Sequence, residues 1–295
     1  MSAIDEKELK DYPKPIFYES TKEILGQMTK NICKININGE KGTAFFAKIP
    51  VNDKLIPALI TNYHLIDKIC LDTKKEIEVE IYKEQPRKIS LENKCTYYNA
   101  DYDTTIIEIK ESKDGKFDYL EFDENILDDN TLFKCIGNSV YILQYPTYHE
   151  DQKLAVSYGI IKNKFEDKPY NFMHFCSTEF GSSGSPILNI NSNKVIGIHK
   201  KRDLTKNYNI GAFLYYSIIG FTVEYLEKEN NKNNQNIINN SNNINQNDNE
   251  CLKEFFKKFN LTINNINITK LDLSFRYIGN DGLKYSIVFV WKNEF

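Results

Sequence analysis

The sequence predicts an all-β core built from two small antiparallel units. From about residue 32 onward, short runs that alternate apolar and polar residues are separated by clusters of Gly, Asn, Asp or Lys, a pattern typical of half-buried strands joined by turns. The runs fall into two sets, over about residues 32–115 and 130–225. Short strands at this spacing favour an antiparallel barrel or sandwich for each set.

The residues before the first set predict an arm followed by a helix, together residues 1–31. The arm is polar and contains Pro13 and Pro15. Residues 17–31 repeat apolar side chains at helical spacing, with Ser20 as a candidate N-cap. We expect one face of this helix to carry Ile24, Leu25 and Met28.

The composition changes abruptly after residue 228. Residues 229–250 are mostly Asn, a composition that cannot bury enough apolar surface to offset the entropy of ordering. We expect a disordered linker there, a β core that spans residues 32–228, and a short α/β appendage formed by residues 251–295. Residues 216–228 would end the core as either a strand or a helix.

The overall composition argues against several classes of protein. The net charge of −3 gives no reason to expect nucleic acid or a membrane surface as a partner. There is no run of about 18 apolar residues to span a membrane, and the charged N-terminus is unlike a secretory signal. The six cysteines are far apart, without CxxC pairs or metal-ligand spacing. We therefore expect a cytoplasmic protein with reduced, packed thiols, no metal and no cofactor.

The first chemical signal is the stretch GSSGSP, residues 181–186, which directly precedes an apolar run. Gly, Ser and Pro also make ordinary turns, and a turn is the plainer interpretation. A serine held on a tight loop beside bare backbone N–H groups is, however, what acyl transfer needs. Because a serine hydroxyl is a weak nucleophile, this interpretation requires a histidine base and an acid that fixes the tautomer of the base.

A histidine and an aspartate stand where predicted strands end or begin. His64 lies near the end of the apolar run of residues 55–67, and Asp103 directly precedes an alternating strand. Taken alone, a histidine in such a place is more often a structural residue and an aspartate more often a turn residue. Asp101 is a rival acid, because in an extended chain it shares a face with Asp103.

Five motifs, in order, resemble those of the chymotrypsin-like serine proteases. GTAFFAKI resembles the G-[ST]-G-F-F strand of that family, ITNYHLI its T-A-A-H-C stretch, and DTTIIEI its D-I-x-L-L-x-L strand. GSSGSP resembles the family's G-D-S-G-G-P loop, and KVIGIHK its V-x-G-I-x-S strand. The resemblance covers about residues 32–225 and implies two six-stranded antiparallel β-barrels with the active site in the cleft between them.

The resemblance also implies roles for individual residues. His64, Asp103 and Ser183 would form the catalytic triad of a serine endopeptidase. The backbone N–H groups of Gly181 and Ser183 would form the oxyanion hole. The family strand begins at its aspartate, which favours Asp103 over Asp101 as the acid.

Several positions depart from the digestive members of the family. Ser182 stands where those enzymes carry the aspartate that pairs with a freed N-terminus, so activation by N-terminal insertion is not expected. Leu65 replaces the cysteine of a usual disulfide, and Lys200 replaces the serine that supports the catalytic aspartate. Asp67 lies too near His64 in the sequence to match the family's acid.

The stretch GSSGSPILNINSNKVIGIHK is closer to the glutamyl endopeptidases, whose motif is G-N-S-G-S-P followed by V-I-G-I-H. This resemblance implies that His199 and Thr178 line the primary specificity pocket and receive an acidic side chain. Ser177 stands where a trypsin has aspartate, so cleavage after Arg or Lys is not expected. The alternative is that His199 is an ordinary strand residue.

The tail of the chain resembles a different family. ITKLDLSFRYIGNDGLKY is similar to one leucine-rich repeat of the ribonuclease-inhibitor type, whose buried ladder would be Leu271, Leu273, Ile278 and Leu283. A single repeat cannot bury its own face, and about three are needed for stability. The alternatives are a truncated array or a marginal helix–strand appendage.

Two functions are compatible with these patterns. The first is an intracellular serine endopeptidase that acts on protein or peptide substrates, with a preference for Glu before the scissile bond. The alternative is a catalytically silent protease fold that serves as a binding module, with the tail as the surface for a protein partner. The three filled triad positions favour the endopeptidase.

Overall fold

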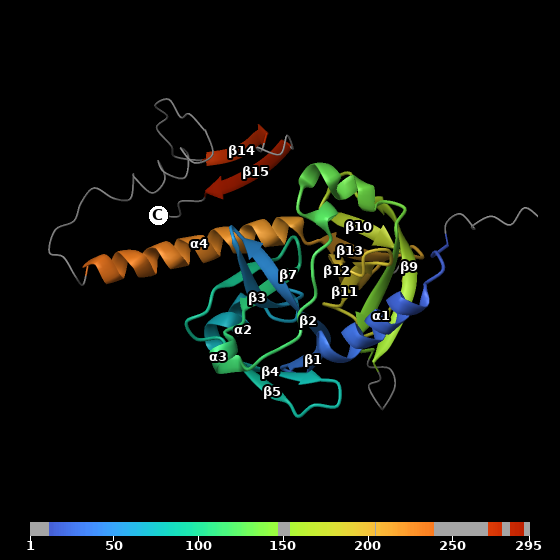
Figure 1. Cartoon of the computed structure of the whole chain (residues 1–295), viewed down its shortest axis with the longest axis horizontal. Helices are drawn as coiled ribbons and strands as arrows, with labels where there is room; N and C mark the ends of the chain where they lie inside the picture. Colours follow the sequence, from blue (N-terminus) through green and yellow to red (C-terminus); the bar gives the residue numbers. More distant parts are fainter. Residues whose placement is uncertain (1–11, 147–153, 204, 239–270, 279–283, 292–295) are drawn as a thin grey trace, which may run out of the picture. The chain divides into compact units, whose positions relative to one another are not determined.

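The computed structural model describes five stretches of the 295-residue chain (Figure 1), namely residues 12–146, 154–203, 205–238, 271–278 and 284–291. The chain divides into two compact units, Met1–Tyr225 and Leu226–Phe295. The first unit holds two large β-sheets, and the second holds a two-stranded sheet.

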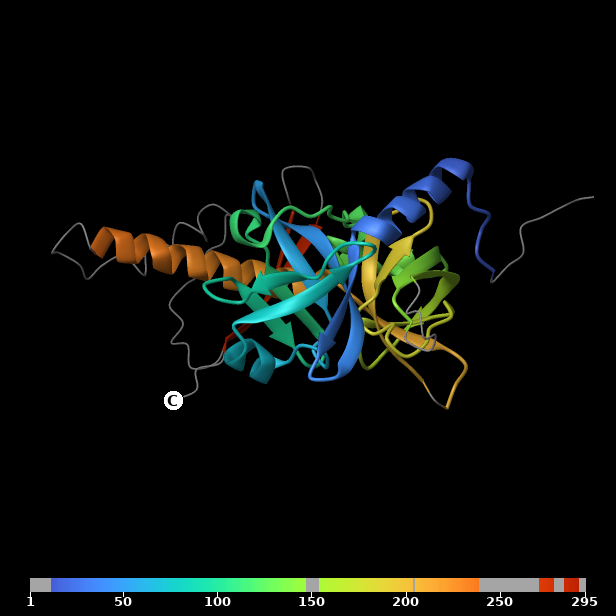
Figure 2. The same ribbon diagram turned by 90° about the horizontal axis from the view of Figure 1, so that it is seen from below.

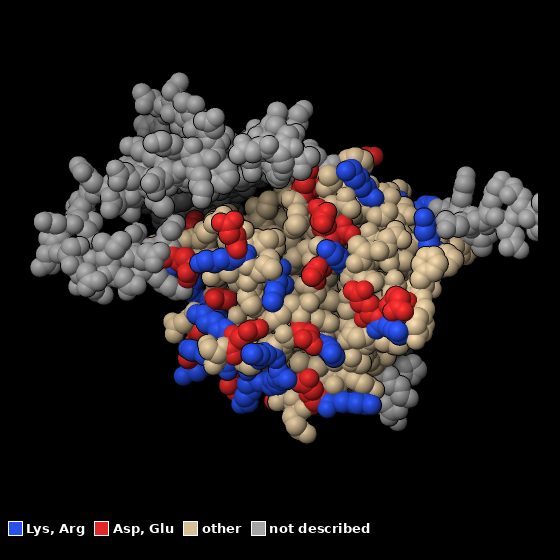
Figure 3. All heavy atoms as spheres, viewed as in Figure 1, with Lys and Arg blue, Asp and Glu red and all other residues tan. Residues whose placement is uncertain are grey.

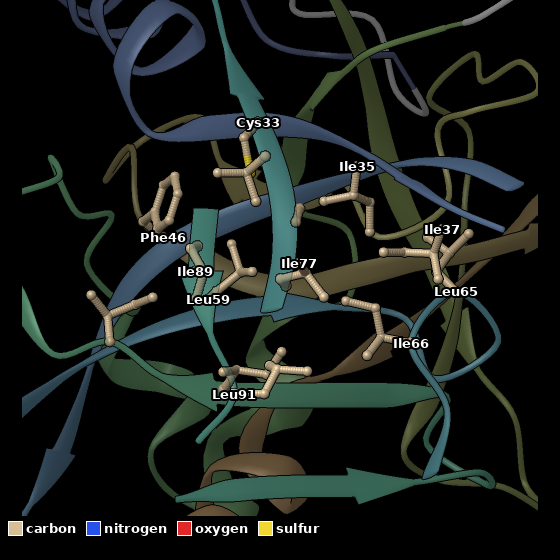
Figure 4. Packing of buried hydrophobic residues seen from close by; sticks show 14 of the residues in the cluster. Cys33, Ile35, Ile37, Phe46, Leu59, Leu65, Ile66, Ile77, Ile89 and Leu91 are labelled. Atoms are coloured by element: carbon tan, nitrogen blue, oxygen red, sulfur yellow. The ribbon is translucent and has the colours of Figure 1, made fainter. Parts of the chain in front are cut away.

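The first large sheet has seven strands in the order β5-β4-β1-β2-β3-β7-β6, with every neighbouring pair antiparallel. Its strands are β1 (Ile32–Ile37), β2 (Glu40–Val51), β3 (Lys54–Thr61), β4 (Glu76–Ile81), β5 (Arg87–Ser90), β6 (Thr96–Asn99) and β7 (Thr104–Glu108). Apolar residues at alternate positions of these strands turn to one side and form a common core (Figure 4), which includes Cys33, Ile35, Phe46, Leu59, Ile77 and Ile89.

The second large sheet is a closed barrel of six strands in the order β10-β13-β12-β11-β8-β9. Its strands are β8 (Ser139–Gln144), β9 (Ala155–Lys164), β10 (Asn171–His174), β11 (Pro186–Asn189), β12 (Val195–Arg202) and β13 (Asn209–Phe213). Short helices lie between the strands of the first unit: α2 (Lys68–Thr73), α3 (Glu111–Asp114), η1 (Glu124–Ile126) and η2 (Asp129–Cys135). The predicted all-β core of two antiparallel units is therefore confirmed.

The first sheet is open, whereas the sequence predicted a second closed six-stranded barrel. β5 and β6 are the two ends of its strand order. At the end of β5, the carboxylate of Asp114 accepts a hydrogen bond from the N–H of Ser90 (3.2 Å); before β6, the carboxylate of Glu108 accepts one from the N–H of Cys95 (2.7 Å). The buried ammonium of Lys94 pairs with Asp114. The N–H of Ser90 is thus satisfied by a side chain, whereas Cys95 and Glu108 extend the pairing of β6 with β7.

Helix α1 (Tyr18–Lys30) confirms the predicted N-terminal helix. Its N-cap position is Phe17, so Ser20 lies inside the first turn and the predicted cap is wrong. Ile24 and Met28 are buried, but Leu25 is exposed. The reason is geometric, because consecutive helical residues point about 100° apart and the buried stripe follows the i, i+4 spacing.

Helix α1 is hydrogen-bonded to the second sheet, the closed barrel, and it lies beside that barrel in Figure 2. The amide of Gln27 donates to the carbonyl oxygen of Asn193 (2.8 Å) and accepts from the hydroxyl of Tyr141 (2.6 Å). The amide of Asn193 also donates to the carboxylate of Glu23 (2.8 Å). The N-terminal helix is therefore part of the folded unit.

Helix α4 (Tyr215–Ile238) begins in the first unit and continues past its last residue, Tyr225, so residues 216–228 form a helix rather than a strand. Its first turns are anchored by the buried side chains of Tyr215, Ile218 and Phe221. Forming the first turn of a helix is unfavourable, and here the buried side chains stabilise that turn. Each further residue then extends the helix by one hydrogen bond. The helix continues over residues 229–238, where the sequence predicted a disordered linker, and residues 239–250 lie outside the described residues.

The described part of the tail is a hairpin. β14 (Leu271–Ile278) pairs antiparallel with β15 (Lys284–Trp291), from Leu271 opposite Trp291 to Ile278 opposite Lys284. A leucine-rich repeat follows its strand with a helix or 3₁₀ turn, so this hairpin does not confirm the predicted repeat. The sequence KYSIVFVW is rich in β-branched and aromatic residues, which favours a strand. Leu283 of the predicted ladder lies outside the described residues.

The described cysteines are free and buried, namely Cys33, Cys70, Cys95, Cys135 and Cys176, whereas Cys251 lies outside the described residues. Burial raises the pKa of the Cys135 and Cys176 thiols to about 12, so these side chains pack as neutral, small apolar groups. Cytoplasmic location stays a prediction.

Two further properties concern possible partners. In the part of the chain that the structure describes, no helix is long and apolar enough to cross a membrane, and no group of three or more His, Cys, Asp or Glu side chains could hold a metal ion. On the face shown in Figure 3, Lys and Arg side chains are intermixed with Asp and Glu. That face therefore lacks a continuous basic surface among its described residues.

Candidate active site

The register of the first sheet brings His64 and Asp103 together. Thr61, at the end of β3, is paired with Thr105, near the start of β7. His64 follows the end of β3 and Asp103 precedes the start of β7, so the two residues emerge at the same edge of the sheet. The imidazole Nδ1 of His64 lies 2.9 Å and 3.0 Å from the two carboxylate oxygens of Asp103. The backbone N–H of His64 also donates to that carboxylate (3.0 Å).

Asp103 is held in an uncommon backbone conformation. Its φ is 53°, in the left-handed region that Asp tolerates better than most residues. The amide of Asn62 donates to its carbonyl oxygen (2.8 Å), and its own N–H donates to the carbonyl of Ala100 (3.3 Å). Such a conformation persists only where the surroundings over-determine it. These contacts hold the backbone of Asp103 in the conformation from which its carboxylate contacts His64.

The two rival acids have other contacts. The carbonyl oxygen of Asp101, rather than its carboxylate, accepts a hydrogen bond from the ammonium of Lys200 (2.8 Å). The carboxylate of Asp67 caps helix α2 by accepting from the N–H of Cys70 (2.8 Å). Of the three carboxylates, the one that contacts His64 among the described residues is that of Asp103.

Ser183 lies in a tight turn between β10 and β11, flanked by two glycines with positive φ, Gly181 at 92° and Gly184 at 84°. A Cβ at Gly184 would lie 2.1 Å from the carbonyl oxygen of Thr43 and 2.5 Å from the hydroxyl oxygen of Thr61. Gly184 is therefore required by close packing against the first sheet. In the described chain, the N–H groups of Gly181 and Ser183 donate to no other backbone group.

Thr43 of β2 fixes the Ser183 turn, and the sequence analysis missed it. Its N–H donates to the carbonyl of Ser183 (2.9 Å), and its hydroxyl donates to the carbonyl of Gly181 (2.9 Å). The same hydroxyl accepts from the N–H of Tyr145, at the end of β8 (3.0 Å). Thr43 lies in the GTAFF motif, which the sequence shows, but the motif alone does not indicate that Thr43 contacts the Ser183 turn.

The Ser183 turn also runs along β12, whose histidine lies near His64. The N–H of Gly184 donates to the carbonyl of His199 (3.1 Å), and the positive charge of His64 helps to lower the pKa of His199. The Ser183 hydroxyl is directed to the carbonyl oxygen of Lys200, at a long 3.5 Å, and the described residues show no hydrogen bond from it to His64. Catalytic hydrogen bonds of this kind often tighten only when substrate binds.

His199 belongs to a buried histidine pair that the sequence analysis did not predict. Its Nδ1 lies 3.1 Å from Nε2 of His174 on β10, and both rings are buried. Burial, assisted by the charge of His64, lowers the pKa of His199 to about 3. Burial and the neighbouring His199 hold the pKa of His174 well below its usual value. His174 lies on the buried face of the alternating run NFMHF, which is the signal that could have found it.

The pair has a preferred tautomer. Nδ1 of His174 is buried and has no hydrogen-bond partner. A buried N–H without an acceptor is rarer than a buried acceptor without a donor, so His174 carries its proton on Nε2 and donates to His199. The proton of His199 is then on Nε2, and neutral His199 can donate a hydrogen bond from that atom.

The other two predicted specificity residues are less closely tied to His199. Ser177 is exposed; its N–H donates to the hydroxyl of Ser157 (2.7 Å) and its carbonyl accepts from the amide of Gln144 (3.1 Å). Thr178 is half-buried, and the described contacts include no hydrogen bond between it and His199.

The buried pair predicts a specific dependence of stability on pH. An exposed histidine titrates near about pH 6.5, whereas His174 and His199 stay neutral to far lower pH in the folded state. Between these values the unfolded state binds more protons, so stability is full above about pH 6.5 and is lost as the pH falls. Keeping each histidine neutral in the folded state should lower the free energy of unfolding by about 2 kcal/mol as the pH falls from 6.5 to 5.

Urea denaturation from pH 5 to pH 7.5 measures this slope. Replacing His174 by Phe removes one of the two protons, so the pH dependence of the variant should be shallower by about one proton. Identical slopes for the wild type and the variant would contradict the assignment of His174 as a buried neutral residue.

Several solved structures are similar to this chain. Among solved structures, the chain is similar to a serine endoprotease from Yersinia pestis, with 15% identity and a TM-score of 0.49 over 69% of this chain and 65% of that one. It is also similar to the inactive form of the Rv3671c protease of M. tuberculosis H37Rv, with 15% identity and a TM-score of 0.47 over 70% and 93% of the two chains. A third similar structure is Deg5, with 13% identity and a TM-score of 0.48 over 68% and 91%.

No curated protein sequence matches the chain. Residues 42–198, however, match the family model of the trypsin-like peptidase domain, which is more than half of the chain. This range contains Thr43, His64, Asp103 and Ser183. The chain therefore belongs to the trypsin-like peptidase family.

Proposed function

We propose that this chain is a serine endopeptidase that cleaves protein or peptide substrates with His64, Asp103 and Ser183 as its catalytic triad. The observation that carries the proposal is the contact of His64 Nδ1 with both carboxylate oxygens of Asp103, at 2.9 and 3.0 Å. This contact leaves Nε2 of His64 as the atom that can act as a base. The glycine-flanked Ser183 turn supplies the nucleophile.

The chemistry follows from these three groups. Ser183 Oγ attacks the scissile carbonyl while Nε2 of His64 takes its proton. The imidazolium then gives that proton to the leaving amine, and an ester links the acyl group to Ser183. Water, deprotonated by His64, attacks this ester and releases the acid, and Ser183 regains its proton. Asp103 holds the imidazole in one tautomer and stabilises the imidazolium.

Gly181 and Ser183 provide the donors of the proposed oxyanion hole. Their N–H groups have no backbone acceptor in the described chain, so both can donate to a developing oxyanion. Thr43 holds the carbonyls of the same two residues, which fixes the adjoining peptides. A donor of this kind contributes about 3–4 kcal/mol to stabilisation of the transition state.

A peptide library with unbiased sequence tests the proposal against the silent binding module. The wild-type chain should release new N-termini from the library, and Ser183→Ala should release none above background. A wild-type protein that binds peptides but leaves them intact, with the same result for Ser183→Ala, would favour the binding module. The C-terminal segment as a surface for a protein partner also stays a prediction.

We further infer that the enzyme prefers Glu before the scissile bond. The support is chemical: neutral His199 can donate from Nε2 to a side-chain oxygen, and a carboxylate is the stronger acceptor. Ser177 replaces the aspartate that would hold Arg or Lys. Thr178 is the second proposed donor, by resemblance to the glutamyl endopeptidases.

The same library measures this preference. The wild type should cleave mainly after Glu, with Gln or a large apolar residue next, and His199→Ala should lose at least about tenfold of its selectivity for Glu, since one charge-assisted hydrogen bond is removed. Dominant cleavage after Arg or Lys, or a preference that His199→Ala leaves unchanged, would contradict this specificity without affecting the proposed triad.

A further inference from the structure

Lys200 is a buried lysine at an irregularity of the second barrel. It lies on β12, and only 6% of its surface is exposed, although lysine is among the residues most rarely buried. β12 pairs His199 with Gly211 and Lys201 with Ile210, so Lys200 is the extra residue of a β-bulge. Bulges redirect side chains and are frequent beside active sites.

The bulge directs the side chain of Lys200 to the loop that carries the proposed catalytic acid. We call residues 100–103 the acid loop. The ammonium of Lys200 donates to the carbonyl oxygen of Asp101 in this loop (2.8 Å) and to the amide oxygen of Asn171 on β10 (3.2 Å). It also lies 5.8 Å from the ring centroid of Tyr170. One ammonium therefore joins the acid loop of the first sheet to the second barrel.

Aromatic packing reinforces the same junction. Tyr102 of the acid loop packs edge-on against Tyr170, with ring centroids 4.8 Å apart, and lies 5.6 Å from the ring of Tyr216. The acid loop is thus attached to the second barrel through both the Lys200 ammonium and the Tyr102 ring. The main chain of Lys200 reaches the nucleophile as well, because its carbonyl accepts from the Ser183 hydroxyl.

Some charges near Lys200 raise its pKa and others lower it. Burial lowers the pKa of Lys200, and the carboxylates of Asp103 and Asp101 oppose that shift. The titratable groups that act on Lys200 or contact it come from three elements: Asp101 and Asp103 of the acid loop, Lys168 and Tyr170 before β10, and Lys201 of β12. His199 faces His64 from the same strand.

We propose that Lys200 is a positioning residue of the peptidase, a role that rests on the proposed function. Its ammonium holds the acid loop so that Asp103 stays aligned with His64, and its positive charge acts on the carboxylate of Asp103, which contacts the imidazole. The serine expected at this position by resemblance has too short a side chain to reach the carbonyl of Asp101 as lysine does. The longer, charged side chain of lysine thus hydrogen-bonds to the acid loop where the family has a short hydroxyl side chain.

The test compares kcat, KM and their pH profiles for four variants. Lys200→Met keeps the apolar stem without the charge, Lys200→Gln keeps a donor without the charge, and Lys200→Arg keeps the charge. Lys201→Met removes the same charge from the neighbouring, exposed residue and is the matched control. Circular dichroism establishes that each variant is folded before kinetics are measured.

Lys200→Met should lose about 10- to 100-fold in kcat with little change in KM, because misalignment of a catalytic group by about 1 Å costs that order. The acid midpoint of its kcat profile should move up by on the order of half a pH unit, since a positive charge that acts on Asp103, the partner of the His64 imidazole, has been removed. Lys200→Gln should show the same shift with a smaller loss of kcat. Lys200→Arg and Lys201→Met should keep the wild-type midpoint.

Other outcomes separate the possible failures. An active wild type whose Lys200→Met and Lys200→Gln variants keep kcat and midpoint would overturn the positioning role and leave the proposed function intact. A loss of kcat without a shift of the midpoint, or failure of both neutral variants to fold, would show that Lys200 is only structural. An inactive wild type would refute the proposed function itself.

Discussion

Replacing Ser183 by Ala, His64 by Ala or Asp103 by Asn should each reduce kcat on a peptide substrate by about 10⁴-fold or more. Ala at position 183 removes the nucleophile, and Ala at position 64 removes its base. Asn at position 103 can donate to Nδ1 of His64, where the carboxylate now accepts at 2.9 Å, and so favours the wrong tautomer. Steady-state kinetics on one peptide measure all three losses.

Asp101→Asn is the matched control, because it makes the same chemical change two residues away. The described contact of Asp101 with Lys200 uses its backbone carbonyl, which the substitution keeps. We therefore expect a loss of less than about tenfold, from the altered charge alone. If Asp101→Asn abolished activity and Asp103→Asn were mild, the acid would be misassigned.

Gly184→Ala should displace the Ser183 turn and cost at least about 100-fold in kcat/KM, the order expected for a shift of about 1 Å in the nucleophile. The new Cβ would lie 2.1 Å from the carbonyl oxygen of Thr43, a backbone atom that cannot move aside easily. Moving it would strain the hydrogen bond from the N–H of Thr43 to Ser183. Chemical denaturation should also show a loss of about 2 kcal/mol or more, from left-handed strain and overpacking together.

Gly39→Ala separates the effect of left-handed backbone strain from the effect of overpacking against Thr43. Gly39 has a similar positive φ, 91°, but a Cβ there would meet nothing within 4 Å. The free energy of unfolding of this variant should fall by only about 1–2 kcal/mol, from the left-handed backbone conformation, and its activity should be unchanged. Equal stability and activity losses in the two variants would mean that contact with Thr43 does not position the serine.

The strands were predictable because half-buried strands leave a period of two in the sequence, and both sheets were found in this way. The open edge of the first sheet was not, because a period of two marks a strand but does not show which strands end a sheet unpaired. The extension of α4 beyond residue 228 was missed for a similar reason. Composition reports the polarity of that tract, but the helix starts from the buried anchors Ile218 and Phe221.

The proposed triad could be named from the sequence because each member lies at the end or start of a strand with a recognisable pattern. The supporting residues could not. Thr43 lies in a recognised motif and His174 in an alternating run, but the role of each depends on contacts with other elements that the local pattern does not show. Lys200 was noticed only as a departure from a family pattern, since its function depends on a bulge that sets its direction. The need for glycine at position 184 also depends on a contact between elements, since a Cβ there would meet the carbonyl oxygen of Thr43.

The most direct test of the central claim is covalent trapping of the nucleophile. A fluorophosphonate probe reacts with a serine only when a base activates it, so the folded wild-type chain should gain one phosphonyl group, which peptide mass mapping should locate on Ser183. His64→Ala should label at least about 10³-fold more slowly, because the base is missing. An unlabelled wild type, or label on another serine that persists in Ser183→Ala, would contradict the assignment of Ser183 as the activated nucleophile.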